Sequence, residues 1–216
     1  MTTQTLSPPI RTLADLLDRL GGVPLDRIRF RPAPGSATLQ DVIDVEQSEG
    51  ILSELVDGVL VEKCMGYNES TLAGFILEML NSFVRPRNLG LVSGMDGTVE
   101  LMPDLVRIPD VAFTDWDRMP GRRRPTAPIP RLAPNLAVEV LSRSNTPGEM
   151  ARKRRDYFGA DVELVWEIDP EERSVVVYTS TGATVLGPAD SLDGGTVLPG
   201  FTLAVADLFA ELDRAG

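Results

Sequence analysis

The segment NLAVEVLSRSN, residues 135–145, constrains the fold most, because it places a carboxylate inside an aliphatic strand. Residues 136–141 form a short apolar run, which is typical of a buried strand, and Glu139 stands at its centre. Removing a lone carboxylate from water remains costly even after the protein relaxes around it. The fold must therefore bring a partner to Glu139.

A second acid poses the same problem. In VRIPDVAFTD, Asp110 follows a proline and begins another apolar strand. Two such acids on neighbouring strands would repel and raise one another's pKa unless a cation sits between them. A divalent ion would accept both carboxylates and a backbone carbonyl as ligands. Lys153, in the helix predicted after the Glu139 strand, is placed to point back at the same cleft. The two acids, the ion and the lysine together indicate metal-assisted phosphodiester hydrolysis.

Each of these residues also has a structural interpretation. Asp110 could end a turn and accept backbone N–H groups. Glu139 could pair with an arginine across the sheet, and Lys153 could belong to a solvated helix face. The pattern alone leaves both interpretations open.

The chain contains no histidine, which excludes histidine-based triads and zinc or haem sites with histidine ligands. A metal would therefore be held mainly by oxygen, which favours Mg²⁺, with Mn²⁺ as an alternative. The single cysteine, Cys64, excludes an internal disulfide, fits a reducing cytoplasm and is expected to fill a small space in the core.

No apolar stretch is long enough to span a membrane, and the first residues lack the pattern of a secretory signal, so a cytoplasmic protein is expected. The net charge of −11 argues against a non-specific nucleic-acid coat protein. Any DNA binding should be weak, salt-sensitive and confined to one cleft.

Strand and helix patterns alternate along the chain, which predicts an α/β (α+β, mixed-sheet) fold. The strand patterns GLVSG, GTVEL and VRIPDVAFTD are interpreted as strands of one sheet. The other expected elements are a tail over 1–11, helices over 12–20 and 38–45, a hairpin over 53–63 with a turn at Asp57-Gly58, an amphipathic helix over 72–84 stopped by Pro86, a loop over 117–134, a helix over 149–157 with a Thr146–Glu149 capping box, strands over 162–169, 174–180 and 183–187, and a helix over 203–214.

Several segments in this order resemble one family. ELVDGVLVEK, RIPDVAF, PNLAVEVLSRSNT, EMARKRRDYF and VELVWEIDP are together similar to the Uma-two family of bacterial restriction endonucleases, within the PD-(D/E)XK nuclease superfamily. The resemblance is strongest over residues 50–180. It implies a restriction-endonuclease-like αβββαβ core, an N-terminal helical arm and a C-terminal β-hairpin plus helix. The expected division is a partly helical arm over 1–48 and a nuclease-like domain over 49–216.

The resemblance also implies roles for individual residues. Asp110 matches the acid of the PD motif, Glu139 matches the acid of the (D/E)XK motif, and Val140 would offer its backbone carbonyl to the ion. Glu54, before the hairpin turn, matches an acid that reaches the site. The chain departs from the superfamily pattern at Leu141, where the motif has lysine, and Lys153 on the following helix stands at the position that matches this family.

The leading hypothesis is a Mg²⁺-dependent endonuclease that hydrolyses DNA, with Asp110, Glu139, Lys153 and Glu54 as catalytic residues. Cleavage of both strands would favour a homodimer. The alternative is a catalytically degenerate, nuclease-like binding or scaffold module. A carbohydrate enzyme with two acids ranks last, because aromatic residues are only 6% of the chain. The arginines expected to contact DNA phosphates are Arg122, Arg123, Arg124, Arg152 and Arg154.

Overall fold

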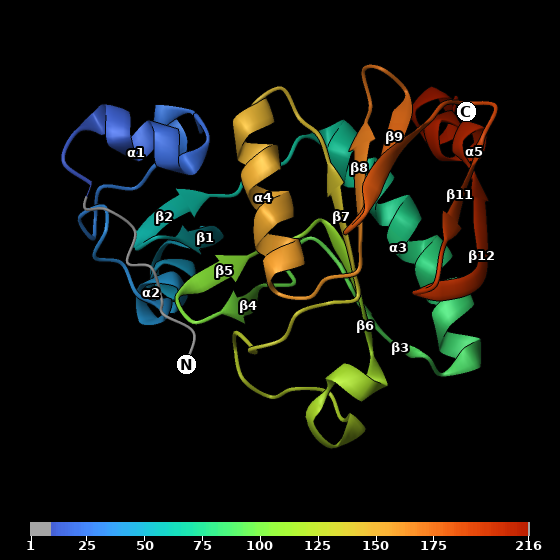
Figure 1. Cartoon of the computed structure of the whole chain (residues 1–216), viewed down its shortest axis with the longest axis horizontal. Coiled ribbons are helices and arrows are strands. Elements are labelled where there is room, and N and C mark those ends of the chain that lie inside the picture. Colours follow the sequence, from blue (N-terminus) through green and yellow to red (C-terminus); the bar gives the residue numbers. More distant parts are fainter. Residues whose placement is uncertain (1–9, 216) are drawn as a thin grey trace.

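The Glu139 strand lies inside a mixed six-stranded sheet in the computed structural model, which describes residues 10–215 (Figure 1). This strand, β7 (Leu136–Val140), pairs antiparallel with β6 (Val111–Asp115) and parallel with β8 (Leu164–Asp169). The parallel pair requires a crossover, which is provided by α4 (Pro147–Gly159). The sheet order is β10, β9, β8, β7, β6, β3, in which β3 is Gly90–Ser93, β9 is Ser174–Thr179 and β10 is Gly182–Leu186.

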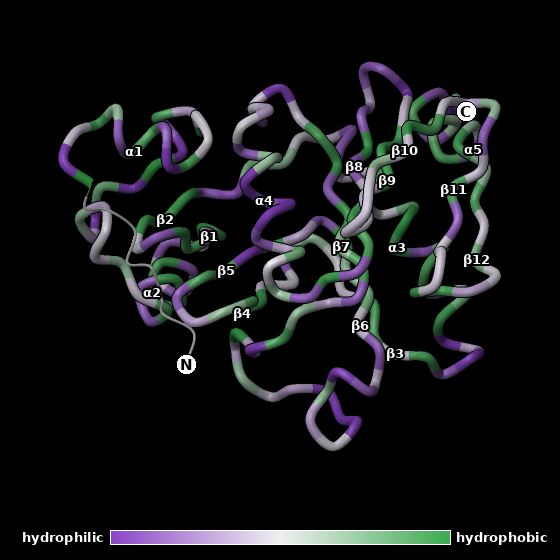
Figure 2. Tube along the Cα trace, in the orientation of Figure 1, coloured by the Kyte–Doolittle hydropathy of each residue, from purple (hydrophilic) through white to green (hydrophobic). Residues whose placement is uncertain are grey.

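Alternation along β7 assigns its side chains to two layers. Leu136 and Val138 pack into the core that α3 (Tyr67–Arg87) covers, whereas Ala137 packs with residues of the α4 side. Because successive side chains of a strand point to opposite faces, Glu139 points to the side of α4. The buried acid therefore faces the helix that carries Lys153. The strands at the centre of the molecule are mainly hydrophobic in Figure 2.

A second, four-stranded sheet has the order β2, β1, β5, β4. The predicted turn at Asp57-Gly58 joins β1 to β2, and both turn residues adopt positive φ, 51° and 73°. The prediction that GLVSG, GTVEL and VRIPDVAFTD share one sheet was wrong. The chain leaves the second sheet and enters the large one around Pro109, which has no N–H with which to continue a ladder. The strands of this sheet are β1 (Ser53–Val56), β2 (Val59–Glu62), β4 (Val99–Met102) and β5 (Leu105–Arg107).

The positions where α1 and α2 begin and end agree better with the capping residues than with the apolar positions used to predict the helices. α1 (Leu13–Leu20) and α2 (Leu39–Glu49) begin with capping boxes, and α2 continues past its predicted end to a glycine in the left-handed conformation. α3 begins before its predicted start and continues through Pro86 to end at Asn88, φ 50°, so the prediction that Pro86 stops it was wrong. Of the chain's first residues, only those from 10 onward are described, so most of the predicted tail lies outside the described part.

The C-terminal segment forms a hairpin and a short helix, as the family resemblance implied. The hairpin consists of β11 (Ser191–Gly194) and β12 (Leu198–Ala204), and α5 (Val205–Ala210) follows. The order α3, β3, β6, β7, α4, β8 is the expected αβββαβ core, with β4 and β5 inserted, so the mixed α/β class is confirmed. Short 3₁₀ turns occur at Leu25–Arg27, Trp116–Arg118, Pro120–Arg122 and Glu211–Asp213. Within residues 10–215, no helix is both long and apolar enough to cross a membrane.

The N-terminal arm contacts the start of α4 at close range. Thr146 donates its hydroxyl to the carbonyl oxygen of Gly21 at 2.6 Å, and a Cβ placed on Gly21 would lie 2.3 Å from the carbonyl carbon of Gly148. The predicted boundary between residues 48 and 49 falls within α2, so the two-domain division stays a prediction.

We expect Gly21→Ala to destabilise the protein by about 3 kcal/mol, because the substitution adds overpacking to the cost of a left-handed backbone. Gly50→Ala is the matched control, since Gly50 has a similar φ of 69° but nothing lies within 4 Å of the place that the added methyl group would take. That control should cost about 1 kcal/mol. Urea unfolding measures both, and equal losses would contradict the close α1–α4 contact.

Candidate functional site

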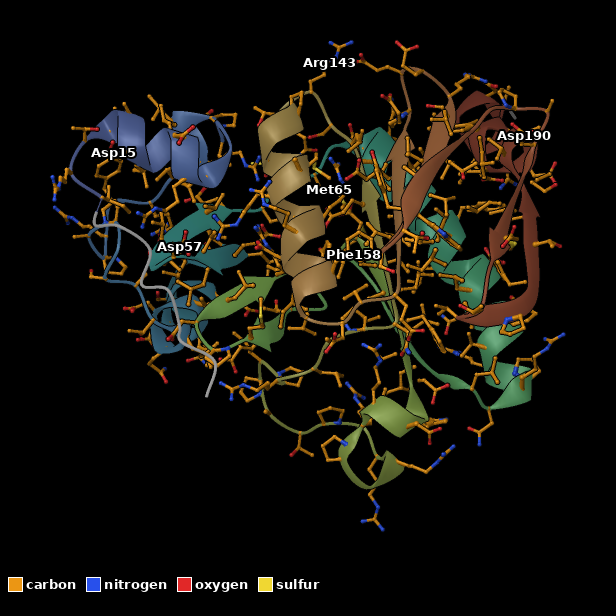
Figure 3. The ribbon with its side chains drawn as sticks, in the orientation of Figure 1. Asp15, Asp57, Met65, Arg143, Phe158 and Asp190 are labelled. Carbon is orange, nitrogen blue, oxygen red and sulfur yellow. The ribbon has the colours of Figure 1, made fainter. Side chains whose placement is uncertain are left out.

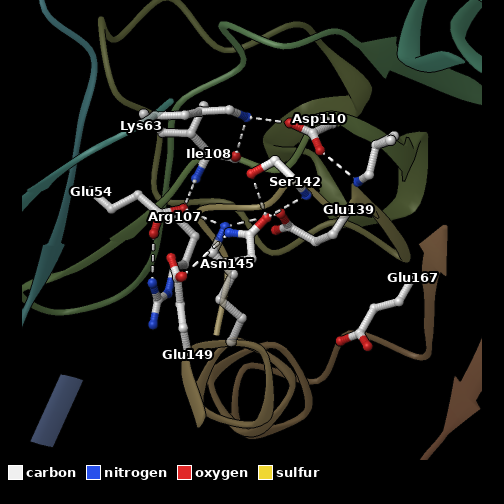
Figure 4. A network of polar contacts seen from close by, with 12 residues as sticks. Glu54, Lys63, Arg107, Ile108, Asp110, Glu139, Ser142, Asn145, Glu149 and Glu167 are labelled. Atoms are coloured by element: carbon white, nitrogen blue, oxygen red, sulfur yellow. Dashed lines mark hydrogen bonds and ion pairs between the residues drawn. The ribbon is translucent and has the colours of Figure 1, made fainter. Parts of the chain in front are cut away.

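Asp110 and Glu139 lie side by side at one end of the β6–β7 pair. The antiparallel register Val111↔Val138 places the two acids next to each other, and the Asp110 N–H donates to the carbonyl of Val138 at 2.9 Å. One oxygen of Asp110, Oδ2, accepts the N–H of Val140 at 2.6 Å. Both acids line one small pocket together with Glu54 (Figure 4). The structure thus brings together the acids that the sequence singled out.

Lys153 lies between two of these acids. Its Nζ is 2.9 Å from Oε2 of Glu139 and 3.2 Å from Oε1 of Glu54, and its side chain is 5% exposed. Tyr157, one turn later on α4, donates its hydroxyl to the other oxygen of Glu139. Lys153 is therefore not on a solvated helix face, and Glu139 is paired with a lysine and a tyrosine rather than an arginine.

Lys63, just after β2, provides the partner of Asp110. Its Nζ is 2.8 Å from Oδ1 of Asp110 and donates to the carbonyl of Ile108 at 2.6 Å. Lys63 was not predicted from the sequence as a site residue. A signal was nevertheless present, because Lys63 and Lys153 are the only lysines in the chain. Both lie in the buried cluster of charged side chains that also contains Asp110, Glu139 and Glu54.

Arg107 is a further buried cation of the cluster and binds two acids. It contacts Glu54 at 2.6 Å and also bonds to Asp156 of α4, and it is 3% exposed. Its position within the apolar run of β5 is the same kind of anomaly as Glu139, and could have been found in the same way.

Arg27, from the N-terminal arm, contributes the last buried pair. Its guanidinium binds both oxygens of Glu149, at 2.9 and 3.1 Å. The N-cap of α4 forms as predicted, because Thr146 accepts the N–H of Glu149. The Glu149 carboxylate binds Arg27 and Asn145, however, so the reciprocal half of the predicted capping box is absent.

The charges in the cluster shift the pKa values of its members in opposite directions. Burial works against ionisation of Glu54, but the cations of Lys153, Arg107 and Lys63 prevail and hold the pKa of Glu54 at about 2. Burial raises the pKa of Glu139, and Asp110 adds to this increase against the attraction of Lys153. Burial and the neighbouring Asp110 thus shift the pKa of Glu139 in the opposite direction to that of Glu54.

Lys153 and Tyr157 stay protonated. Burial alone would lower the pKa of Lys153, but the carboxylates of Glu139 and Glu54 reverse the effect and raise it. Burial raises the pKa of Tyr157 well above its usual value, and the negative charge of Glu139 raises it further. Both side chains are therefore hydrogen-bond donors to the acids at neutral pH.

The oxygen donors of this pocket match a hard divalent cation. Among the described residues, no three Asp, Glu or Cys side chains form a group that could hold a metal ion. Two carboxylates, Asp110 and Glu139, with the backbone carbonyl of Val140, would supply the protein ligands, and Mg²⁺ ordinarily keeps waters in its remaining positions. The types of donor therefore fit, although Lys63 contacts Oδ1 of Asp110, and Lys153 and Tyr157 contact the two oxygens of Glu139.

A cleft of about 1060 Å³ opens beside this pocket, between the start of α3, the loop before α4 and the ends of β8 and β9. Cys64 lines it and is exposed, so the expectation of a core cysteine was wrong. Two arginines, Arg143 and Arg154, line the cleft. Arg143 projects from the surface in Figure 3, with its side chain 92% exposed, whereas Arg154 pairs with Glu167 at 2.6 Å. The acids of the lining are Glu69, Glu167, Asp169 and Glu171.

The other predicted phosphate-contacting arginines do not line this cleft. Arg152 turns toward the arm and binds Asp57 at 3.2 Å. Arg122, Arg123 and Arg124 follow β6, which begins at the acids and leads away from them, and Figure 2 shows this hydrophilic turn beyond the end of the sheet. The structure therefore places only Arg154 of the predicted five in the cleft, and phosphate contact by these residues stays a prediction.

Comparison with known proteins places this geometry in a family. The family model Uma2, described as "Putative restriction endonuclease", matches residues 39–206, which confirms the family expected from the ordered motifs. A solved structure described as "a putative nuclease belonging to DUF820 from Anabaena variabilis ATCC 29413" has a TM-score of 0.66 and 23% identity, covering 74% of this chain and 91% of the other. At that identity the likeness shows a shared fold. No curated protein matches the chain.

The low pKa of Glu54 predicts an acid-dependent contribution to stability. A carboxyl whose folded pKa is depressed stabilises the protein above its unfolded pKa, near 4.5, and loses this contribution as the pH falls toward about 2. We expect Glu54→Gln to cost about 3 kcal/mol at pH 7, because Arg107 and Lys153 lose a counter-charge.

Urea unfolding between pH 7 and pH 3 measures this difference, which should narrow steadily below about pH 4.5. Glu46→Gln, on the exposed face of α2, is the control and should change stability little at any pH. If the difference in unfolding free energy between wild type and Glu54→Gln stays constant with pH, the charge of Glu54 is not what stabilises the cluster.

Proposed function

The chain belongs to the Uma2 family, and we propose that it is an endonuclease that hydrolyses DNA phosphodiester bonds with Mg²⁺, or Mn²⁺, held at Asp110 and Glu139. Family membership supports a nuclease. The observation that carries the proposal is the pairing of these two acids on adjacent strands, with Lys153 buried beside them. Such an arrangement resembles a reaction centre, because buried charges rarely gather in a core for stability alone.

The acids and the carbonyl of Val140 would hold the ion. When bound, a divalent ion would lower the pKa of a coordinated water and neutralise charge on the phosphate. Glu54 remains ionised because its pKa is about 2, so it fixes Lys153 rather than accepting a proton. Tyr157 anchors the second oxygen of Glu139 and thereby orients the carboxylate.

Lys153 acts as an ammonium in this proposal. The carboxylates of Glu139 and Glu54 raise the pKa of Lys153 in the metal-free site, which favours the ammonium form over a free lone pair. A buried ammonium beside Glu139 would instead orient the attacking water or balance negative charge that develops on the phosphate. The lysine missing at Leu141 is thus replaced from α4.

The neighbouring cleft is the proposed path for DNA. Arg143 and Arg154 would contact phosphates, while the acids of the lining would keep binding weak and strongly dependent on salt. A cytoplasmic location and a homodimer remain predictions from the sequence.

One observation favours the alternative, a nuclease-like binding module without catalysis. Asp110, Glu54 and Glu139 each already have a buried cationic partner, so their burial does not require a metal ion. The two functions differ in whether a divalent ion binds and whether DNA is cleaved.

We expect wild-type protein to nick or cut plasmid DNA with Mg²⁺ or Mn²⁺, and Asp110→Asn and Glu139→Gln to lower the rate by about 100-fold or more. The readout is conversion of supercoiled plasmid at low salt. Glu163→Gln is the control, because Glu163 pairs with Arg118 at the far end of β8. This variant should cut at the wild-type rate. Equal cutting by all variants would indicate a contaminant, and Mn²⁺ binding without cleavage would support the binding module.

A further inference from the structure

Lys63 takes up the oxygen of Asp110 that a metal ion would need. Oδ2 of Asp110 is engaged by the N–H of Val140 at 2.6 Å, which leaves Oδ1 as the oxygen able to bind a cation. Lys63 contacts that oxygen at 2.8 Å and a second hard oxygen, the carbonyl of Ile108, at 2.6 Å. Carboxylate and carbonyl oxygens are also the ligands that a hard divalent ion takes, so the ammonium stands where such an ion would be attracted.

A divalent ion and the Lys63 ammonium repel one another if both contact Oδ1. The repulsion is strong because the Lys63 side chain is only 8% exposed, and water screens buried charges poorly. Lys153 contacts the other proposed ligand instead: it binds Oε2 of Glu139 and Oε1 of Glu54, and Lys63 is the cation at Asp110.

The wide cleft begins next to Lys63 in the chain. The residues that follow it, Cys64 and Met65, line both the small pocket and the wide cleft. The lysine side chain is a flexible four-carbon stem, and a displaced ammonium would turn from Asp110 toward that cleft. There it would join Arg143 and Arg154 as a third cation facing the space proposed for DNA.

We propose that Lys63 is a built-in counter-cation that holds the place of the divalent ion at Asp110 and has to be displaced for the ion to bind. This inference rests on the proposed function. Lys63 thus weakens metal binding, keeps the metal-free site neutral, and couples metal binding to the release of a positive charge toward the phosphates of a substrate. The coupling is reciprocal, so a phosphate that attracts the released ammonium also favours the metal.

The test is calorimetric titration of the full chain with Mn²⁺ alone, without DNA. Lys63→Met should bind Mn²⁺ with a Kd about 10-fold lower than wild type, because the competing charge is gone. Lys63→Gln removes the charge but keeps a polar group, and should also bind more tightly; it serves if the methionine variant does not fold. Lys63→Arg retains the charge and should show no gain.

Thermal unfolding gives a second readout that is independent of affinity fits. Without metal, Lys63→Met should melt below wild type, because Asp110 is left unpaired. Saturating Mn²⁺ should raise its Tm by more than it raises that of wild type.

The outcomes separate this inference from the proposed function. If Asp110→Asn loses Mn²⁺ binding while Lys63→Met and Lys63→Gln bind as wild type does, or more weakly, the metal site stands and the role of Lys63 is overturned. If neither wild type nor the Lys63 variants bind Mn²⁺, both proposals fail. If Lys63→Met and Lys63→Gln bind Mn²⁺ more tightly than wild type and Lys63→Arg does not, the role of Lys63 as a counter-cation is supported.

Discussion

The ion pair between Glu139 and Lys153 is the constraint around which the rest of the structure is arranged. It joins the central strand to the crossover helix, and its burial requires that each remaining oxygen and proton finds a partner. Tyr157, Glu54 and Arg107 meet that requirement in turn, which extends one pair into a connected network. Well-packed apolar side chains are often as stable in such a place, so the network is consistent with the proposed function.

The arm belongs to this network as well. Arg27 binds the Glu149 carboxylate at the start of α4, and Gly21 approaches Gly148 so closely that neither position accepts a side chain. The helix that carries Lys153 is therefore held at its first turn by residues more than a hundred positions earlier in the chain. The position of the lysine depends on the arm, although the family motifs themselves begin after it.

The sequence predicted those parts of the site that local rules determine. Glu139 and Asp110 were found because an acid in an apolar strand violates the expected pattern, and the α4 cap was found because Thr146 and Pro147 are local signals. The partners were missed for a physical reason. Lys63 and Arg107 reach the acids through pairing between strands, and periodicity within one segment carries no information on which segments meet. The same limit explains why β4 and β5 were assigned to the wrong sheet, since strands of either sheet have the same period.

The buried pairs differ in their cation: Lys63 and Lys153 bind the two proposed metal-binding acids, whereas Arg27 and Arg107 form the other buried pairs. All basic residues other than Lys63 and Lys153 are arginines, and the buried arginines make two-pronged contacts, Arg27 with Glu149 and Arg107 with Glu54 and Asp156. A planar guanidinium with fixed donors suits a pair that does not part. An ammonium is a compact point charge whose donors rotate freely, and it resembles a small metal ion more closely than a guanidinium does. At Asp110 the cation is such an ammonium, which suits the exchange with a metal ion that we propose for Lys63.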